Sequence, residues 1–424
     1  MPPKVIIALG LLLFTGMMAA GYLYNVTFIQ LGLVDLGTRL IGLNRPAVAG
    51  YMAVLAVLTC ATALLVGWAM LHRPRLRHFR FKLRAAFVAV ALQALLTAAA
   101  PFLREPGQLL AWIVAGSLAL GLAVPVTFGL AVDLVPVRLR GHVAAAITAI
   151  AYFAAAVLIR SWHIEDVAVQ MLVVIVPGAI ALGVLAFAPL PFVDEWSRRH
   201  WSPEFGRGRY VSAIESSTRP AWRVAGIVAL MFAVFFIDSL GFLRLAETPH
   251  LMAASWTATD LAPRLTIGVV HVLTAVIGGV IYTNLGARHL FYWIFAIFAL
   301  VHLMYVFQAW LTPLSGGTVA QPALYATAVS LYTVITFALW ADISTPVTIG
   351  RNTAVGVALS GWLATFLSTA VALRWAASEV SLEQHLRWVD ALALIFLLLM
   401  LALAVWPTPR PQPPSGAPME KKRA

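Results

Sequence analysis

Twelve apolar stretches, each long enough to cross a bilayer, constrain this chain more than any other feature. A membrane-spanning helix needs about 20 mainly apolar residues. In lipid, every backbone N–H and C=O group must be bonded within the protein, so we expect an all-α integral membrane protein with 12 transmembrane helices. The stretches cover residues 5–30, 46–71, 84–103, 108–131, 142–160, 167–190, 223–243, 264–284, 290–310, 320–341, 353–375 and 387–406.

The composition supports a lipid environment. Hydrophobic residues make up 61% of the chain and charged residues 11%, whereas a soluble domain carries roughly 25% charged residues. The net charge of +12 does not indicate a nucleic-acid partner, because the basic residues lie in short loops between apolar runs. The single cysteine, Cys60, excludes disulfides and cysteine metal sites. We expect a monomer in a lipid bilayer, without a metal or a cofactor.

The distribution of basic residues predicts the topology. With both termini in the cytoplasm, 21 of the 29 Lys and Arg residues fall on the cytoplasmic side. This bias favours N-in and C-in, which requires an even number of helices. We expect the protein in a plasma or inner membrane. The longest polar interruption separates six helices from six. We therefore expect an N-terminal bundle over 1–192, a cytoplasmic central loop over 193–221, a C-terminal bundle over 222–407 and a disordered cytoplasmic tail over 408–424.

The two halves repeat the same pattern of charged, polar and glycine residues, which predicts two pseudo-symmetric six-helix bundles. Four pairs of residues align the halves at offsets of 209 to 213 positions: Asp133 with Asp342, Arg140 with Arg351, Gly67 with Gly279, and Asn25 with Asp238. Repeated intramembrane architecture is typical of transporters.

Short glycine and charged motifs carry a family resemblance. The eighth stretch ends with Gly279, Gly286 and Arg288, and the second ends with Gly67 and basic residues. The fourth and fifth stretches are joined by Asp133 and Arg140-Gly141, and the tenth and eleventh by Asp342 and Arg351. In these motifs the chain resembles the major facilitator superfamily (MFS), although Thr283 stands where that family has an acid.

The resemblance implies a secondary active transporter that works by alternating access. It does not favour a proton-driven multidrug exporter, because the fourth stretch lacks the expected Arg and the fifth lacks a Gly-Pro pair. The residues Asp133, Arg140, Asp342 and Arg351 are expected at the cytoplasmic rim, where ion pairs can form in one state and break in another. We expect Arg140 and the basic segment after the second helix to pair with acids there, including Asp133. Alternatively, these four residues cap the ends of their helices and are exposed to water.

Asp238 and His271 are the main candidates for substrate or proton binding. An ionisable side chain inside the bilayer is costly and is a functional candidate by default. Asp238 lies 15 residues beyond Arg223, and His271 lies seven residues beyond Arg264 on a helix of opposite direction, so both are expected at a similar depth. A carboxylate and an imidazole together can bind and release a proton. The alternative is a structural hydrogen bond between helices.

Five further polar residues are candidates for binding a small solute of unknown identity. They are Asn25, Gln30, Gln93, Tyr332 and Thr333. Each is equally compatible with a hydrogen bond to a neighbouring helix or to a local backbone carbonyl.

Two other function classes compete with transport. A membrane-embedded glycosyltransferase would need a catalytic acid just outside the first helix, where Asp35 lies, but the short outer loops offer no nucleophile or metal motif. A non-transporting scaffold would keep the fold and lose the motif after the second helix. We expect no enzymatic activity, and transport assays separate these classes.

Overall fold

The computed structural model describes residues 2–158, 163–199, 201–217, 220–246, 258, 260–311 and 319–402. Within these ranges the chain is helical without strands, and 12 helical spans are long and apolar enough to cross a membrane. The expected all-α fold with 12 spans is thus confirmed. The tail predicted over 408–424 lies outside the described residues.

The first six spans form the N-terminal half. They consist of α1 (Pro3–Tyr24) continued by η1 (Asn25–Gly32), α2 (Leu33–Asp35) and η2 (Leu36–Leu40); α3 (Arg45–His72); α4 (Phe79–Ala99) with η4 (Ala100–Phe102); α5 (Pro106–Gly129) with α6 (Ala131–Leu134); η5 (Val137–Leu139) with α7 (Arg140–Leu158); and α8 (Ile164–Phe187).

The last six spans form the C-terminal half. They consist of α11 (Pro220–Ala246); α13 (Leu261–Leu285); α14 (Ala287–Leu311); α15 (Ala320–Asp342); α16 (Ile349–Thr353) continued by η6 (Ala354–Leu363) and α17 (Ala364–Ala377); and α18 (Leu382–Ala402). Between the halves lie the short helices α9 (Pro191–Arg199) and α10 (Val211–Glu215).

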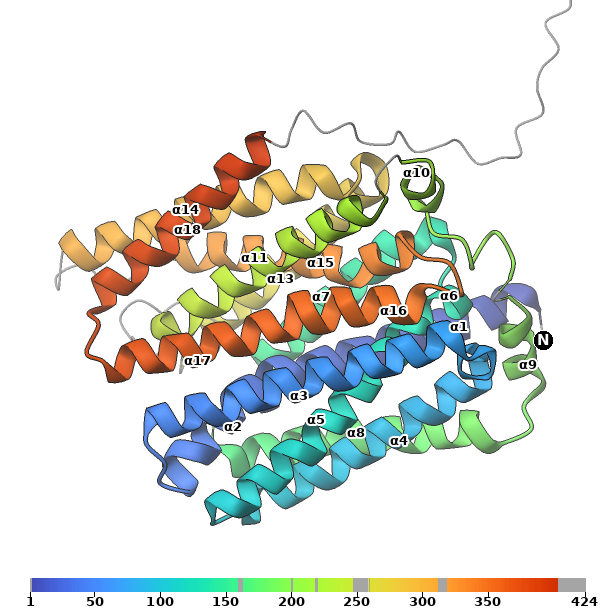
Figure 1. Ribbon diagram of the computed structural model, residues 1–424, viewed down its shortest axis with the longest axis horizontal. Coiled ribbons are helices and arrows are strands. Elements are labelled where there is room, and N and C mark those ends of the chain that lie inside the picture. Colours follow the sequence, from blue (N-terminus) through green and yellow to red (C-terminus); the bar gives the residue numbers. More distant parts are fainter. Residues whose placement is uncertain are drawn as a thin grey trace, which may run out of the picture.

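The spans lie side by side along one direction, and the short helices α9 and α10 lie at one end of the bundle (Figure 1). That end also carries α6 and the N-terminus, and we call it the α9 face. Asp133 and Asp342 stand at this face, at the ends of the fourth and tenth spans, and both are fully buried. These are the corresponding positions that the repeat predicts.

The first span is longer than its apolar stretch predicts. It continues from residue 30 to Leu40 through two π-helical segments, so Asp35 lies inside the helix rather than beyond its end. Arg39 Nε donates to Asp35 Oδ1 over 2.8 Å. This pair joins two residues four positions apart in the extended part of the helix.

Glycines bring the two halves into backbone contact near the α9 face. A Cβ atom on Gly67 of α3 would lie 2.6 Å from the Gly350 carbonyl oxygen of α16, and one on Gly279 of α13 would lie 2.8 Å from the Gly141 carbonyl oxygen of α7. Small residues allow helix axes to approach this closely in membranes. The motif glycines Gly67, Gly141 and Gly279 therefore hold the two halves together.

Gly67→Ala should weaken this contact, because its new methyl group meets backbone, which cannot move aside alone. We expect a destabilisation of about 1–3 kcal/mol, typical of overpacking, and a lower melting temperature in detergent. Gly50→Ala is the matched control on the same helix, since no atom lies within 4 Å of its Cβ position. Equal melting temperatures for the two variants would contradict the contact.

Candidate functional site

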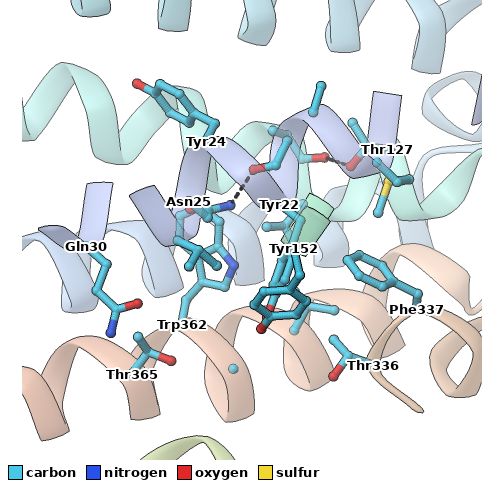
Figure 2. A pocket seen from close by; sticks show the side chains of 18 of the residues that line it. Tyr22, Tyr24, Asn25, Gln30, Thr127, Tyr152, Thr336, Phe337, Trp362 and Thr365 are labelled. Carbon is cyan, nitrogen blue, oxygen red and sulfur yellow. Dashed lines mark hydrogen bonds between the residues drawn. The ribbon is translucent and has the colours of Figure 1, made fainter. Parts of the chain in front are cut away.

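A cavity of about 440 Å³ lies between the two halves. Ligand pockets are typically about 300–1,000 Å³, so this one has room for a small organic solute. The first span contributes Asn25 and Gln30 to its wall, and Trp362 and Thr365 of the eleventh span face them (Figure 2). The wall also includes exposed residues of α1 and α8, namely Gly16 and Gly178, so the cavity reaches the side of the bundle.

Asp238 of α11 supplies the only formally charged side chain among the described residues that line this cavity. Two tyrosines of α15 hold its carboxylate. Tyr325 Oη donates to Oδ1 over 2.6 Å, and Tyr332 Oη donates to Oδ2 over 2.5 Å. Within the described part of the chain, no Lys, Arg or His side chain forms an ion pair with Asp238. The carboxylate is thus oriented by hydroxyl groups without a neutralising charge.

His271 of α13 lies on the same cavity but does not contact Asp238. Its Nδ1 atom is 2.8 Å from the Ser330 hydroxyl, and its ring stacks on Tyr152 with the centroids 4.1 Å apart. The Nε2 atom is buried and has no hydrogen-bond partner in the described structure. The predicted similar depth of the two residues brings them to one cavity, while tyrosines, rather than His271, hold the acid.

A tyrosine cluster connects the halves at the centre of the molecule. Tyr22 of α1 and Tyr152 of α7 share a hydrogen bond of 2.7 Å between their hydroxyl groups. Tyr22 Oη also lies 3.2 Å from Thr333 Oγ1 of α15. Any motion of one half against the other must rearrange these bonds.

The other predicted polar residues occupy different environments. Asn25, Gln30, Gln93 and Tyr332 line the cavity. The Asn25 amide is partly used locally, because it donates to the Gly21 carbonyl oxygen over 3.1 Å. Thr333 hydrogen-bonds the Val329 carbonyl oxygen and the tyrosine cluster, which agrees with the local alternative.

Four residues that surround Asp238 and His271 were not predicted from the sequence. They are Tyr22, Tyr152, Tyr325 and Ser330. A signal for one of them was present, because Tyr325 lies seven residues before Tyr332 and therefore on the same helix face. Nothing in the sequence indicated that this face would meet Asp238.

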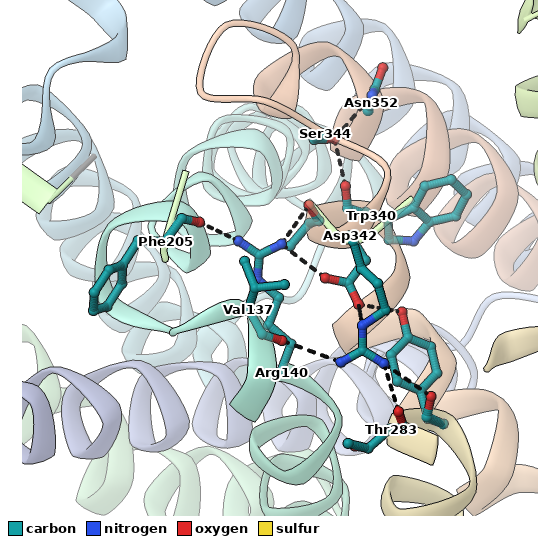
Figure 3. Close-up of polar contacts among 11 residues, drawn as sticks. Val137, Arg140, Phe205, Thr283, Trp340, Asp342, Ser344 and Asn352 are labelled. Carbon is teal, nitrogen blue, oxygen red and sulfur yellow. Dashed lines mark hydrogen bonds and ion pairs between the residues drawn. The ribbon is translucent and has the colours of Figure 1, made fainter. Parts of the chain in front are cut away.

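An ion pair between Arg140 and Asp342 joins the two halves at the α9 face (Figure 3). Arg140 Nη1 donates to Asp342 Oδ1 over 2.9 Å and to the Ala341 carbonyl oxygen over 2.8 Å. Tyr282 Oη donates to the other carboxylate oxygen of Asp342 over 2.9 Å. Both charged side chains are buried, at 2% and 0% exposed. We call Arg140, Asp342, Tyr282 and the linker residue Arg209 the latch.

Arg209 brings the segment between the halves into the latch. Its Nε atom lies 3.7 Å from Asp342 Oδ2, and Nη1 donates to the Thr283 carbonyl oxygen over 3.0 Å. Burial alone would lower the pKa of Arg209, but Asp342, Tyr282 and Tyr210 together outweigh burial and the pKa is raised. Burial raises the pKa of the neighbouring Tyr210 phenol, and Asp342 raises it further. Arg209 therefore stays charged and Tyr210 neutral.

The linker backbone is also hydrogen-bonded to both halves. The Phe205 carbonyl oxygen accepts from Arg140 Nη2 over 2.5 Å, while the Gly208 and Tyr210 amides donate to the carbonyl oxygens of Ser344 and Asp342. A Cβ atom on Gly208 would lie 2.4 Å from the Asp342 carbonyl oxygen. Only glycine fits at this close approach.

The repeated acid in the N-terminal half has a different partner. Asp133 pairs with Lys82 of α4, both fully buried, and Lys82 Nζ also donates to the Gly129 carbonyl oxygen over 2.8 Å. Lys82 belongs to the basic segment after the second helix, so this contact agrees with the expected pairing of that segment with Asp133, whereas Arg140 pairs with the other acid, Asp342. Arg140 sits at the start of α7, where it faces the C-terminal half, and α4 offers a closer cation to Asp133.

The remaining motif residues have structural contacts. Arg351, the repeat partner of Arg140, donates to Asn352 Oδ1 over 3.0 Å and does not form an ion pair in the described structure. Gly286 ends α13 with a φ of +88°, a conformation that favours glycine, and its amide donates to the Ile281 and Tyr282 carbonyl oxygens. Arg288 Nε donates to Tyr292 Oη over 3.0 Å.

No protein-family model and no curated protein sequence matches the chain. Solved structures do. A crystal structure of the human organic anion transporter MFSD10 matches at 15% identity and a TM-score of 0.60, over 94% of this chain and 100% of that one. A D-xylose-proton symporter matches at 16% identity and a TM-score of 0.62, over 93% and 96%.

A bacterial homologue of the iron transporter ferroportin, in an outward-facing state, matches at 14% identity and a TM-score of 0.57. It covers 94% of this chain and 98% of that one. Because the similarity extends over nearly the whole of both chains, the protein has the MFS fold that its motifs suggested.

Asp342→Asn should open the α9 face. The substitution leaves Arg140 and Arg209 buried without their anion, and breaking a buried pair this way typically costs about 3–5 kcal/mol. The reporter is Ser344→Cys, in a Cys60→Ser background, because Ser344 is fully buried in the described structure. We expect a maleimide to label this cysteine faster in the Asp342→Asn protein.

Asp35→Asn is the control, since it removes an ion pair with Arg39 that lies within one half. Unchanged labelling in Asp342→Asn, or an equal rise in both proteins, would count against the latch. A melting curve of each variant separates gate opening from global unfolding.

Proposed function

We propose that this protein is a secondary active transporter that moves a small solute across a membrane by alternating access. The observation that carries the proposal is a cavity between two halves, with a carboxylate in its wall that has no ion-pair partner among the described residues and a latch of buried charges at one end. Proteins of this fold with solved structures are described as carriers of an organic anion, of iron, and of xylose with protons. They are transporters rather than enzymes, which supports a non-enzymatic role.

We infer that the α9 face is cytoplasmic. The linker with its arginines, the basic segment after α3 and the N-terminus all gather there, as positive charges do on the cytoplasmic side. Both termini are then cytoplasmic. The N-terminal bundle ends near residue 192, and the C-terminal bundle extends from about residue 222 to about residue 407. The closed latch corresponds to a state in which the cavity is shut from the cytoplasm.

Transport in this scheme requires the latch to break. Rocking of the halves separates Arg140 from Asp342 and pulls the glycine contacts apart, which exposes the cavity to the cytoplasm. When the halves separate, Arg140 and Asp342 lose their mutual attraction, but both side chains become hydrated. This exchange limits the net free energy of opening, because water compensates much of the lost attraction between two charges.

Asp238 is our candidate for the coupling residue. Its charge would be costly in a cavity without a cation, and a proton can neutralise it. Tyr325 and Tyr332 hold the carboxylate toward the cavity, so proton binding and solute binding occur in the same compartment. His271, with its unpartnered Nε2, is the second candidate for a proton or substrate contact.

Asp238→Asn should abolish proton-driven accumulation of solute in proteoliposomes and spare solute exchange, because exchange needs no net movement of protons. Asp390→Asn is the matched control. Asp390 is a buried acid of α18 that does not line the cavity. Accumulation on a pH gradient by the Asp238→Asn protein would refute the coupling role.

The two competing classes make different predictions for the same assay. A scaffold would bind no solute and move none in either direction. The glycosyltransferase alternative relies on Asp35, which is bonded to Arg39 and accepts the Ile164 amide over 2.9 Å; this favours a structural role for the acid.

A further inference from the structure

The surroundings of Asp238 favour a particular class of ligand. Phe235 and Phe242 precede and follow it by three and four residues, so all three side chains share one face of α11. The ring of Phe235 lies 4.9 Å from that of Tyr332, and the ring of Phe242 lies 6.4 Å from that of Tyr325. One carboxylate is thus surrounded by four aromatic rings from two helices.

The rest of the cavity wall is also rich in aromatic side chains. Twelve of its described lining residues are Phe, Tyr or Trp, and none is Lys or Arg. Aromatic faces attract cations through their quadrupoles, whereas an anion would meet an acid without a basic side chain to offset it. The wall therefore disfavours anions, and its one formally charged group among the described lining residues favours a cation over a neutral solute.

We propose that the central cavity binds an organic monocation with a flat, apolar body, its charge held against the Asp238 carboxylate among Phe235, Tyr325 and Tyr332. The two tyrosine hydroxyl groups use one lone pair on each carboxylate oxygen, so the remaining lone pairs stay open to the positive charge of a ligand. The unpartnered Nε2 of His271 offers a second polar contact to the ligand. This inference rests on the proposed transport function and names its substrate class.

A cation and a proton then compete for the same carboxylate, so cation binding should weaken as the pH falls. The titratable and charged groups on Asp238's own helix and on its neighbours enter any pH profile. They include Tyr325 and Tyr332 of α15, His302 and Tyr305 of α14, His271 and Arg264 of α13, His385 and Asp390 of α18, Arg374 of α17, Arg223 and Arg244 of α11, Tyr22 of α1 and Tyr152 of α7.

Three probes of the same two-ring shape test the charge preference. They are the permanent cation N-methyl-4-phenylpyridinium, its neutral parent 4-phenylpyridine and the anion biphenyl-4-carboxylate. Calorimetric titration of the full chain in detergent at pH 8 should show binding of the cation at least about tenfold tighter than the neutral compound, with the anion weakest. Equal affinities, a preference for the anion, or no binding of the cation would overturn the proposal.

Variants tie the preference to the carboxylate. Asp238→Asn should weaken cation binding about tenfold or more and remove its pH dependence, while affinity for 4-phenylpyridine stays unchanged. Asp390→Asn should leave cation binding as in the parent protein. If Asp238→Asn binds the cation as tightly as the parent does, the assigned site is wrong.

A panel of transport assays distinguishes a wrong substrate class from a wrong transport function. Counterflow in proteoliposomes is measured with the cation, a neutral sugar and a carboxylate. Movement of the sugar or the carboxylate, but not the cation, would refute the substrate class and support transport. Failure of every solute would count against both, with melting curves confirming that the protein is folded.

Discussion

The buried carboxylate of Asp342 is the interaction on which the closed arrangement of this protein depends. It accepts hydrogen bonds from Arg140 in the N-terminal half and from Tyr282 in its own half, and it lies next to Arg209 of the linker. A lone carboxylate at 0% exposure would be prohibitively costly. Each partner compensates part of that cost, so three separate segments of the chain must meet before this one side chain can be buried.

The two halves repeat their acids but not their pairing. Asp133 is neutralised inside its own half by Lys82, whereas Asp342 is neutralised across the interface by Arg140. A pair within one half moves as part of a rigid unit and is unaffected by rocking. A pair across the interface changes its energy with the relative position of the halves. The two acids are equivalent in the sequence repeat, but only the ion pair of Asp342 depends on how the two halves are placed relative to each other.

Hydrophobic length predicted the fold because it is a local property of the chain. All 12 spans could be identified, and the position of the two repeated acids followed from the offsets. The end of the first span was misjudged, because the helix continues beyond residue 30 through Asp35 to Leu40.

Pairing across helices was less predictable. Arg140 and Asp238 were recognised as important, but their partners Asp342, Tyr325 and Tyr332 depend on which faces of distant helices meet. Helix rotation and depth decide that, and no spacing along the chain encodes them directly.

The linker contributes an entropic term to the closed state. Gly208, Arg209 and Tyr210 are ordered by backbone bonds to Ser344 and Asp342, and fixing each residue of a chain costs about 1–2 kcal/mol of conformational entropy. Opening the latch returns that freedom and so offsets part of the lost attraction. At the same time the linker is tethered to both halves, which keeps Arg209 at a high effective concentration near its site. In the transport cycle that we propose, the segment that connects the halves therefore acts as a built-in ligand, which is bound in the closed state and released on opening.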